Sequence, residues 1–298
     1  MIERLLIGDN SFIGVNHLSQ EKSRDTLLRL TTSKMADIIE AAFEAGAQGL
    51  LHSSHPTMKE VLEVMRSRGY GREFSTFMIV PDMQSSVRIV SERGILGLLR
   101  DMLGGVTVSR KAKSIVSGGL SALTFDPTGL LETYLDTEVS VFAKSSPRSC
   151  HLKSVFLHEI LSELIISFRM EKFMKEYIRH VTDSLHLLPG FATRNFARFI
   201  DFTTEIGVPL DRIVILSPFN AVGFQMNPDR ESCEEKLRRH PEANVIAMSV
   251  FASGYLDMKQ AMDYVTRLPV QVSCVVGTSN LDHARSAFPY MQKRLGLA

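Results

Sequence analysis

The chain has 298 residues, with 34 Lys and Arg against 33 Asp and Glu and a formal net charge of +1. Hydrophobic residues make up 44% and charged residues 22%, which excludes a disordered chain and allows a large buried core. The balanced charge, without a long basic stripe, argues against nucleic acid or an acidic membrane surface as the main partner. The three cysteines form no CxxC or CxxxC pair, which argues against a thiolate zinc site and against a disulfide framework.

The N-terminal ten residues have no long apolar segment of the kind found in secretory signals. The longest apolar runs, such as residues 161–168, are interrupted and far shorter than the roughly 20 residues of a membrane span. We therefore expect a cytoplasmic protein with reduced thiols whose partner is a small molecule, with neither nucleic acid nor a membrane involved. The sequence is also compatible with a homo-oligomer.

Short apolar runs alternate with amphipathic stretches along the chain, which is the pattern of an α/β protein. The runs expected as strands are 5–8, 49–51, 77–80, 154–157, 187–193, 212–216, 244–249 and 272–276. The helices expected between and after them are 32–44, a helix starting near 56, 128–143, 160–181, 196–206 and 281–294. Because eight strand–helix units need about 250 residues, the sequence predicts one (β/α)8 TIM barrel domain over residues 1–298.

Residues 83–127 interrupt this alternation. They are rich in glycine and contain a short apolar run at 122–125. We interpret the segment as an insertion after strand three. If 122–125 joined the sheet as a ninth strand, a doubly wound sheet would be the rival fold.

The last third of the chain is similar to a known family. Residues 244–256 read N-V-I-A-M-S-V-F-A-S-G-Y-L, and residues 275–284 read V-V-G-T-S-N-L-D-H-A. These stretches resemble the seventh strand and the eighth strand with its phosphate loop in the aldo-keto reductases. The stretches 215–220 and 154–158 resemble the sixth and fourth strands, and the fourth carries the family's active-site His. The resemblance implies an aldo-keto reductase-like barrel, NADP as one candidate cofactor, and His158 as the counterpart of that His.

The other three members of the family's catalytic tetrad are missing. The family has D-T-A after strand two and a proton-donating Tyr five residues after the Asp, whereas this chain has His52-Ser-Ser and then Thr57. The family's Lys at the end of strand three is replaced by a V-P-D turn that ends at Asp82. Carbonyl reduction needs an acid that protonates the new alkoxide. The resemblance therefore implies a divergent member, for which ordinary aldo-keto reductase chemistry is not expected.

Polar residues at the carboxyl ends of the strands are the candidate site, because catalytic groups of such barrels lie there. We predict His158 as the acid/base group, since the unperturbed pKa of histidine is near neutrality. Asp9 or Glu159 would orient it, and Arg194 would clamp a carboxylate or phosphate. The remaining predicted catalytic residue is His52, and the other ligand-binding candidates are Asn10, Asn195 and Asn220.

The turn before the last helix predicts an anion site. Backbone N–H groups at a helix start, together with the helix dipole, favour a phosphate. The predicted residues are Gly277, Thr278, Ser279 and Asn280, with Ser253 and Gly254 after strand seven as the facing wall. The alternative is simple capping of the helix by Ser279 or Asn280, without a ligand.

Three functions are compatible with these residues. The first is an enzyme that acts on a small polar, phosphate-bearing ligand through His158. The second is a metal-dependent hydrolase or lyase, because imidazole and carboxylate groups suit a divalent metal; its ligands would be His52, His158, Glu159 and Asp9. The third is a barrel that binds a ligand without catalysis. The sequence leaves open whether the protein is an enzyme.

Overall fold

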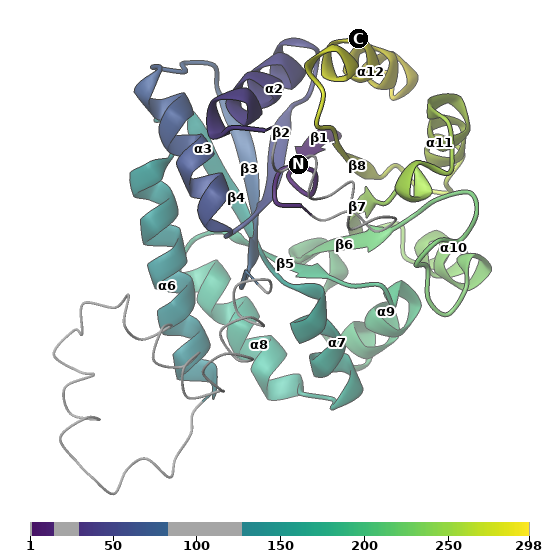
Figure 1. Ribbon diagram of the computed structural model, residues 1–298. Helices are drawn as coiled ribbons and strands as arrows, with labels where there is room; N and C mark the ends of the chain where they lie inside the picture. The colour runs from purple at the N-terminus through teal and green to yellow at the C-terminus, as the bar shows by residue number, and fades with distance from the viewer. Residues whose placement is uncertain (1, 15–29, 83–126, 298) are drawn as a thin grey trace, which may run out of the picture.

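In the computed structural model, which describes residues 2–14, 30–82 and 127–297, eight parallel strands close into a barrel in chain order, with β8 paired to β1 (Figure 1). The predicted (β/α)8 fold is therefore confirmed, and the doubly wound alternative is wrong. The run at 122–125 and nearly all of the predicted insertion at 83–127 lie outside the described residues. Within the described ranges, no helix combines the length and apolar character needed to cross a membrane.

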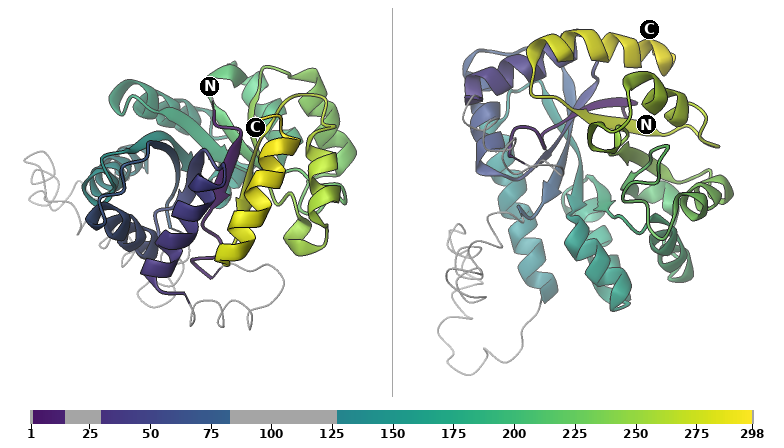
Figure 2. Two further views of the ribbon diagram at one scale, coloured as in Figure 1. Left: turned by 90° about the horizontal axis from the view of Figure 1, so that it is seen from above. Right: turned by 45° about the vertical axis from the view of Figure 1, so that its right-hand side comes forward.

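The barrel strands follow one another in the predicted order, and two helices, at 230–239 and 258–265, add to those expected from the sequence. The strands are β1 (Leu5–Gly8), β2 (Gly49–Ser53), β3 (Phe74–Val80), β4 (Cys150–Leu157), β5 (Leu188–Ala192), β6 (Val214–Pro218), β7 (Asn244–Met248) and β8 (Ser273–Gly277). The helices are α2 (Thr32–Glu44), α3 (Pro56–Ser67), α6 (Pro127–Ser145), α7 (Glu159–Ser167), α8 (Glu171–Arg179), α9 (Phe196–Glu205), α10 (Arg230–Arg239), α11 (Met258–Val265) and α12 (Leu281–Arg294). Figure 2 shows the helices placed around the outside of the strands.

One predicted helix is wrong in its extent. The segment 160–181 forms two helices, α7 and α8, instead of one. Arg169 lies between them with a φ of 52°, in the left-handed region that ends a right-handed helix. Residues His180–Ser184 then add one turn of π-helix before β5.

Side chains that alternate along the strands make two apolar layers. Each of the eight strands contributes to a compact buried cluster in the lumen: Leu6, Leu51, Phe77, Phe156, Ala192, Val214, Leu216, Ile246 and Val275. A larger cluster fills the space between the strands and the helices. The barrel interior is therefore a packed core and not a pore, which leaves the strand ends as the place for a ligand.

Gly190 of β5 shows how tightly the lumen is filled. It pairs with Phe156 of β4, and a Cβ atom at Gly190 would lie 2.5 Å from the Phe156 ring. Only glycine leaves room for that ring, because real Cβ atoms do not approach so closely.

Candidate functional site

A cavity of about 700 Å³ opens at the carboxyl end of the barrel, and residues at or after all eight strands line it. Its volume is in the range of small-molecule sites. Apolar side chains of the lumen, including Leu51, Leu216 and Val275, border the cavity, and polar side chains from the loops form much of its wall. The predicted residues on this wall are Asp9, Asn10, His158, Glu159, Arg194, Ser253, Gly254 and Gly277.

His158 follows β4 and is held in one orientation. Its Nδ1 accepts a hydrogen bond from the Ile160 backbone N–H at 3.2 Å, so the ring caps the first turn of α7. Because Nδ1 is the acceptor, the neutral ring carries its proton on Nε2. Burial lowers the pKa of His158; Glu159 opposes that shift and Arg194 adds to it. At neutral pH the ring is therefore an uncharged group whose free donor is Nε2–H.

Glu159 and Arg194 form an ion pair on the cavity wall. Arg194 Nε donates to Glu159 Oε2 at 2.8 Å, and Arg194 Nη2 donates to Oε1 at 2.7 Å. Glu159 was predicted to orient His158. In the structure its two carboxylate oxygens accept hydrogen bonds from Arg194 instead.

Asp9 is a buried carboxyl group at the end of β1. Its Oδ2 accepts hydrogen bonds from the Ser53 backbone N–H at 2.8 Å and from the Ser53 hydroxyl at 2.7 Å. Burial raises the pKa of Asp9, against the opposing effect of the Ser53 hydrogen bonds and of nearby His52. The protonated form of Asp9 is therefore favoured more than in an exposed aspartate. Asp82, after β3, lines the same cavity.

His52 does not reach the cavity. Leu51 and Ser53 line it, so the residue between them points to the other face of β2. There the His52 ring stacks on Phe142 of α6, with 5.6 Å between ring centroids, and its Nδ1–H donates to the Ser53 carbonyl at 2.9 Å. Of the candidate residues at the strand ends, His158 and Gly277 line the cavity and His52 does not.

The predicted metal site is not supported. Since His52 faces the helix layer, the four proposed ligands do not converge. Over residues 2–14, 30–82 and 127–297, no three His, Cys, Asp or Glu side chains lie close enough to hold a metal ion.

Two predicted ligand-binding amides hold loops instead. Asn195 Nδ2 donates to Glu163 Oε2 at 2.6 Å. Asn220 is buried; its Nδ2 donates to the Phe224 carbonyl, and its Oδ1 accepts from the Phe224 N–H, both at 2.8 Å. Neither side chain is part of the cavity wall described above. Both act by fixing the loops after β5 and β6.

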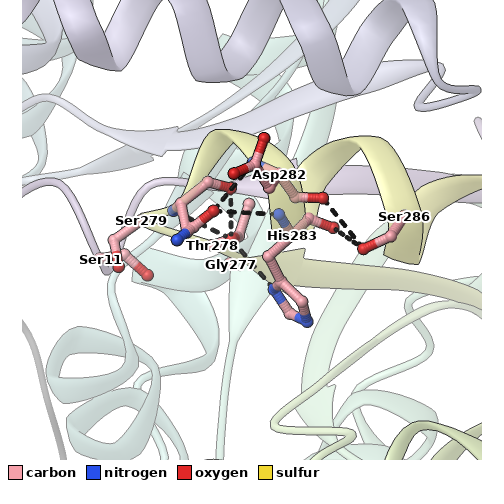
Figure 3. Close-up of a pocket in the computed structure, with 8 residues that line it drawn as sticks. Ser11, Gly277, Thr278, Ser279, Asp282, His283 and Ser286 are labelled. Carbon is pink, nitrogen blue, oxygen red and sulfur yellow. Dashed lines mark hydrogen bonds between the residues drawn. The ribbon is translucent and has the colours of Figure 1, made fainter.

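A second, more open hollow of about 630 Å³ adjoins the cavity at the end of β8 (Figure 3). Gly277 belongs to both, and a Cβ atom there would lie 3.1 Å from the Ser11 hydroxyl oxygen. The hollow is lined by Ser11, Gly277, Thr278, Ser279, Asn280, Asp282, His283 and Ser286. The predicted phosphate turn therefore lines one open, hydroxyl-rich surface.

The N-cap interaction that was considered as the alternative to a phosphate site is also observed at this turn. Asn280 Oδ1 accepts hydrogen bonds from the N–H groups of Asp282 at 2.8 Å and of His283 at 3.1 Å, so Asn280 is the N-cap of α12. Ser279 remains exposed beside it. Capping by Asn280 leaves the Ser279 side chain available to the hollow.

Strained backbone gathers around the cavity. Gln225, Ser249 and Ser253 have φ values of 60°, 53° and 58°, and all three line the cavity. Ala252, in the same loop as Ser253, has a φ of 46°. Left-handed backbone at residues other than glycine is unfavourable and gathers at functional sites. These conformations mark the loops after β6 and β7 as part of the candidate site.

Sequence patterns missed several residues of this site. Ser53 follows from the two-residue alternation of β2, which places Gly49, Leu51 and Ser53 on one face. Glu163, which binds the loop after β5, sits on α7 one turn after Glu159. Its contacts join segments distant in the chain, so no local pattern indicates them.

Solved structures of aldo-keto reductases share this fold. A Pseudomonas aeruginosa protein assigned as an aldo-keto reductase has a TM-score of 0.60 and 13% identity, over 98% of this chain and 90% of that one. A glycerol dehydrogenase from Gluconobacter oxydans has a TM-score of 0.54 and 10% identity, over 99% and 93% of the two chains. An aldo-keto reductase from a deep-sea metagenome library has a TM-score of 0.51 and 8% identity, over 90% and 86%.

No protein-family model matches the sequence, and a comparison with curated proteins also finds no match. At these identities the structural likeness establishes the fold. The chain is a (β/α)8 barrel that shares its fold with these aldo-keto reductase structures, and the resemblance predicted from its strands is confirmed at the level of the fold.

Proposed function

We propose that the protein is an enzyme that binds a small polar, phosphate-bearing molecule across the carboxyl end of the barrel, with His158 at the reacting oxygen. The observation that carries the proposal is that His158 and the Gly277 turn line one cavity. The similar structures named as a glycerol dehydrogenase and aldo-keto reductases support an oxidoreductase-like activity.

The hollow at the end of β8 suits the phosphate. The hydroxyl groups of Ser11 and Ser279 line it and are donors for phosphate oxygens, whereas the Thr278 and Ser286 hydroxyls donate to the backbone carbonyls of Asn280 and Asp282. Gly277 adds no side chain, so a ligand can approach the backbone there. A nicotinamide dinucleotide is one candidate; its phosphate would be held by this turn, and the bound cofactor would supply hydride transfer.

His158 acts in this proposal as a fixed hydrogen-bond donor. Protonation of Nδ1 would break its bond with the Ile160 N–H, which opposes an imidazolium. A neutral Nε2–H still stabilises negative charge that develops on a carbonyl or hydroxyl oxygen of the substrate. Asp9, whose pKa is raised by burial, supplies an acid on the same cavity wall.

The phosphate site is tested by titrating the protein with NADPH and with NADH while nicotinamide fluorescence is followed, with inorganic phosphate as competitor. We expect saturable binding that weakens at least tenfold in S279D, because the new carboxylate repels the phosphate. S232D is the matched control, since it places the same charge in the first turn of α10, away from the lining residues of the cavity and hollow. Equal binding by S279D and the wild type would refute the phosphate site.

A further inference from the structure

The wall of the cavity contains one permanent cation. Among the described lining residues, Arg194 is the only Arg or Lys, and acidic side chains such as Asp82 and Asp257 line the wall as well. An anionic group on a ligand that enters the cavity therefore has one favourable partner there. Arginine is suited to this role because its planar fork matches a carboxylate with two parallel hydrogen bonds.

Arg194 keeps donors for such a group. The bidentate pair with Glu159 uses one N–H of Nε and one of Nη2. A guanidinium has five N–H donors, so three remain, two of them on Nη1. No other side chain in the described part of the chain accepts a hydrogen bond from this guanidinium. The edge away from Glu159 is thus the one that a ligand can use.

Glu163 holds the backbone that carries Arg194. Its Oε1 accepts hydrogen bonds from the Thr193 hydroxyl at 2.8 Å and from the Arg194 N–H at 3.0 Å. Its Oε2 accepts from Asn195 Nδ2 at 2.6 Å. The Arg194 carbonyl accepts from the Asn227 N–H at 2.9 Å, so the loop is fixed on both sides.

Both partners of the ion pair reach the cavity. The side chains of Arg194 and Glu159 are 34% and 26% exposed, so a ligand in the cavity can contact them. Glu159 and Glu163 are four residues apart on α7 and so share one face of the helix. One helix thereby fixes both the guanidinium and the main chain of Arg194, which is what a preorganised ligand contact requires.

We propose that Arg194 binds a carboxylate of the substrate through the edge that Glu159 leaves free, and that Glu163 is the positioning residue that sets this edge. The proposal rests on the proposed function, because it places the substrate in the same cavity. It adds that the substrate is a small carboxylic acid, held at one end by Arg194.

The test uses three probes with the same three-carbon skeleton: glycerate, glycerol and glycerol 3-phosphate. Their dissociation constants are measured by NMR titration at low ionic strength. We expect the wild type to bind glycerate at least tenfold more tightly than glycerol. R194K should lose that preference and bind glycerol as before, because lysine has no planar fork. R198K, an exposed arginine of α9 that does not line the cavity, is the matched control and should behave as the wild type.

The positioning role of Glu163 is tested by rescue. E163A removes the acceptors for the Thr193 hydroxyl, the Arg194 N–H and Asn195 Nδ2, so we expect glycerate binding to weaken threefold to tenfold while glycerol binding is unchanged. The conservative variant E163Q should keep glycerate binding near the wild-type value, because the Asn195 amide can turn its Oδ1 toward the new Nε2–H. N195A, which removes only the Oε2 contact, should weaken glycerate binding in the same direction and serves if E163A does not fold. Glycerate binding at the wild-type level in both E163A and N195A overturns the positioning role.

The outcomes separate this proposal from the phosphate site. Equal binding of glycerate and glycerol, or no binding of glycerate, overturns the assignment of a carboxylate to Arg194. Neither result bears on the phosphate site, which the S279D titration tests separately. A preference for glycerol 3-phosphate that R194K removes also overturns the carboxylate assignment, because Arg194 would then bind phosphate. Glycerate binding that S279D removes and R194K does not would place the anion at the Gly277 turn and overturn the assignment as well.

Discussion

Replacing His158 separates its two roles, capping α7 and facing the cavity. H158A removes both the Nδ1 acceptor for Ile160 N–H and the Nε2–H donor. H158N removes the ring but keeps an oxygen acceptor, because asparagine is among the best N-cap residues. The pair of variants therefore tests whether the 3.2 Å hydrogen bond from the Ile160 N–H to His158 Nδ1 stabilises the start of α7.

The expected stability change follows from the size of the chain. Loss of an N-cap costs about 1 kcal/mol. Unfolding entropy of roughly 2.1 cal/mol/K per residue over 298 residues is about 0.6 kcal/mol/K, so H158A should lower Tm by about 2 °C. H158N should stay within about 0.5 °C of the wild type on the same scale. Differential scanning calorimetry resolves these changes.

The hydrogen-bonding state of the ring is read directly from histidine-selective ¹⁵N NMR spectra. We expect a neutral His158 protonated on Nε2 at pH 7.5, and the signal is assigned by its loss in H158N. Both variants should lose turnover of any substrate by about 10²-fold to 10³-fold, the usual effect of removing one oxyanion donor. Equal Tm losses in H158A and H158N, or a ring protonated on Nδ1, would refute the reasoning.

Three further predictions concern the barrel and its buried titratable groups. G190A should destabilise the fold by about 1–3 kcal/mol, because a Cβ would overlap the Phe156 ring; urea denaturation at pH 7.5 measures this, and an unchanged midpoint would contradict it. Burial lowers the pKa of His52, so the unfolded chain binds the proton more readily than the folded chain. Stability should then fall as pH drops below about 6.5, and H52F should show a shallower fall in denaturation curves between pH 7.5 and 5.5. Burial raises the pKa of Asp9, so the cost of its ionisation is present above the unfolded value of about 3.9; D9N should raise stability at pH 8 by about 1 kcal/mol, and a less stable D9N would show that the Ser53 hydrogen bonds outweigh burial.

The fold was predictable where strands are buried on both faces. The predicted bounds of β1, α2 and α12 agree with the structure to the residue, and those of β7 and β8 to within one residue. β4 begins four residues before the predicted run, because residues 150–153 alternate between partly buried and exposed and so lack a continuous apolar pattern. The break at Arg169 was invisible because no glycine marks its left-handed backbone.

The site was predictable only in part, for a different reason. Strand ends locate His158, Arg194 and the Gly277 turn because the fold puts every strand end on one face. Side chains alternate between the two faces of β2. Ser53 therefore shares the cavity face with Leu51, and His52 lies on the opposite face. The orientation of Arg194 depends on Glu163, and contacts between α7 and the loop after β5 exist only in the folded barrel.

The resemblance implies a Tyr and a Lys that this chain lacks at the matching positions, so the proposed function needs another acid. In the proposed function His158 donates to a substrate oxygen, and the hydrogen bond that its Nδ1 accepts from the Ile160 N–H opposes its use as an acid. Thr57 lies in the first turn of α3, where its N–H bonds His55. Asp9 lines the cavity from β1, and burial raises its pKa, so we propose it as the acid in the proposed function. Under the proposed function, a barrel with its acid on β1 and its donor on β4 would carry out proton transfer at a substrate oxygen with residues other than the Tyr and Lys that the resemblance implies.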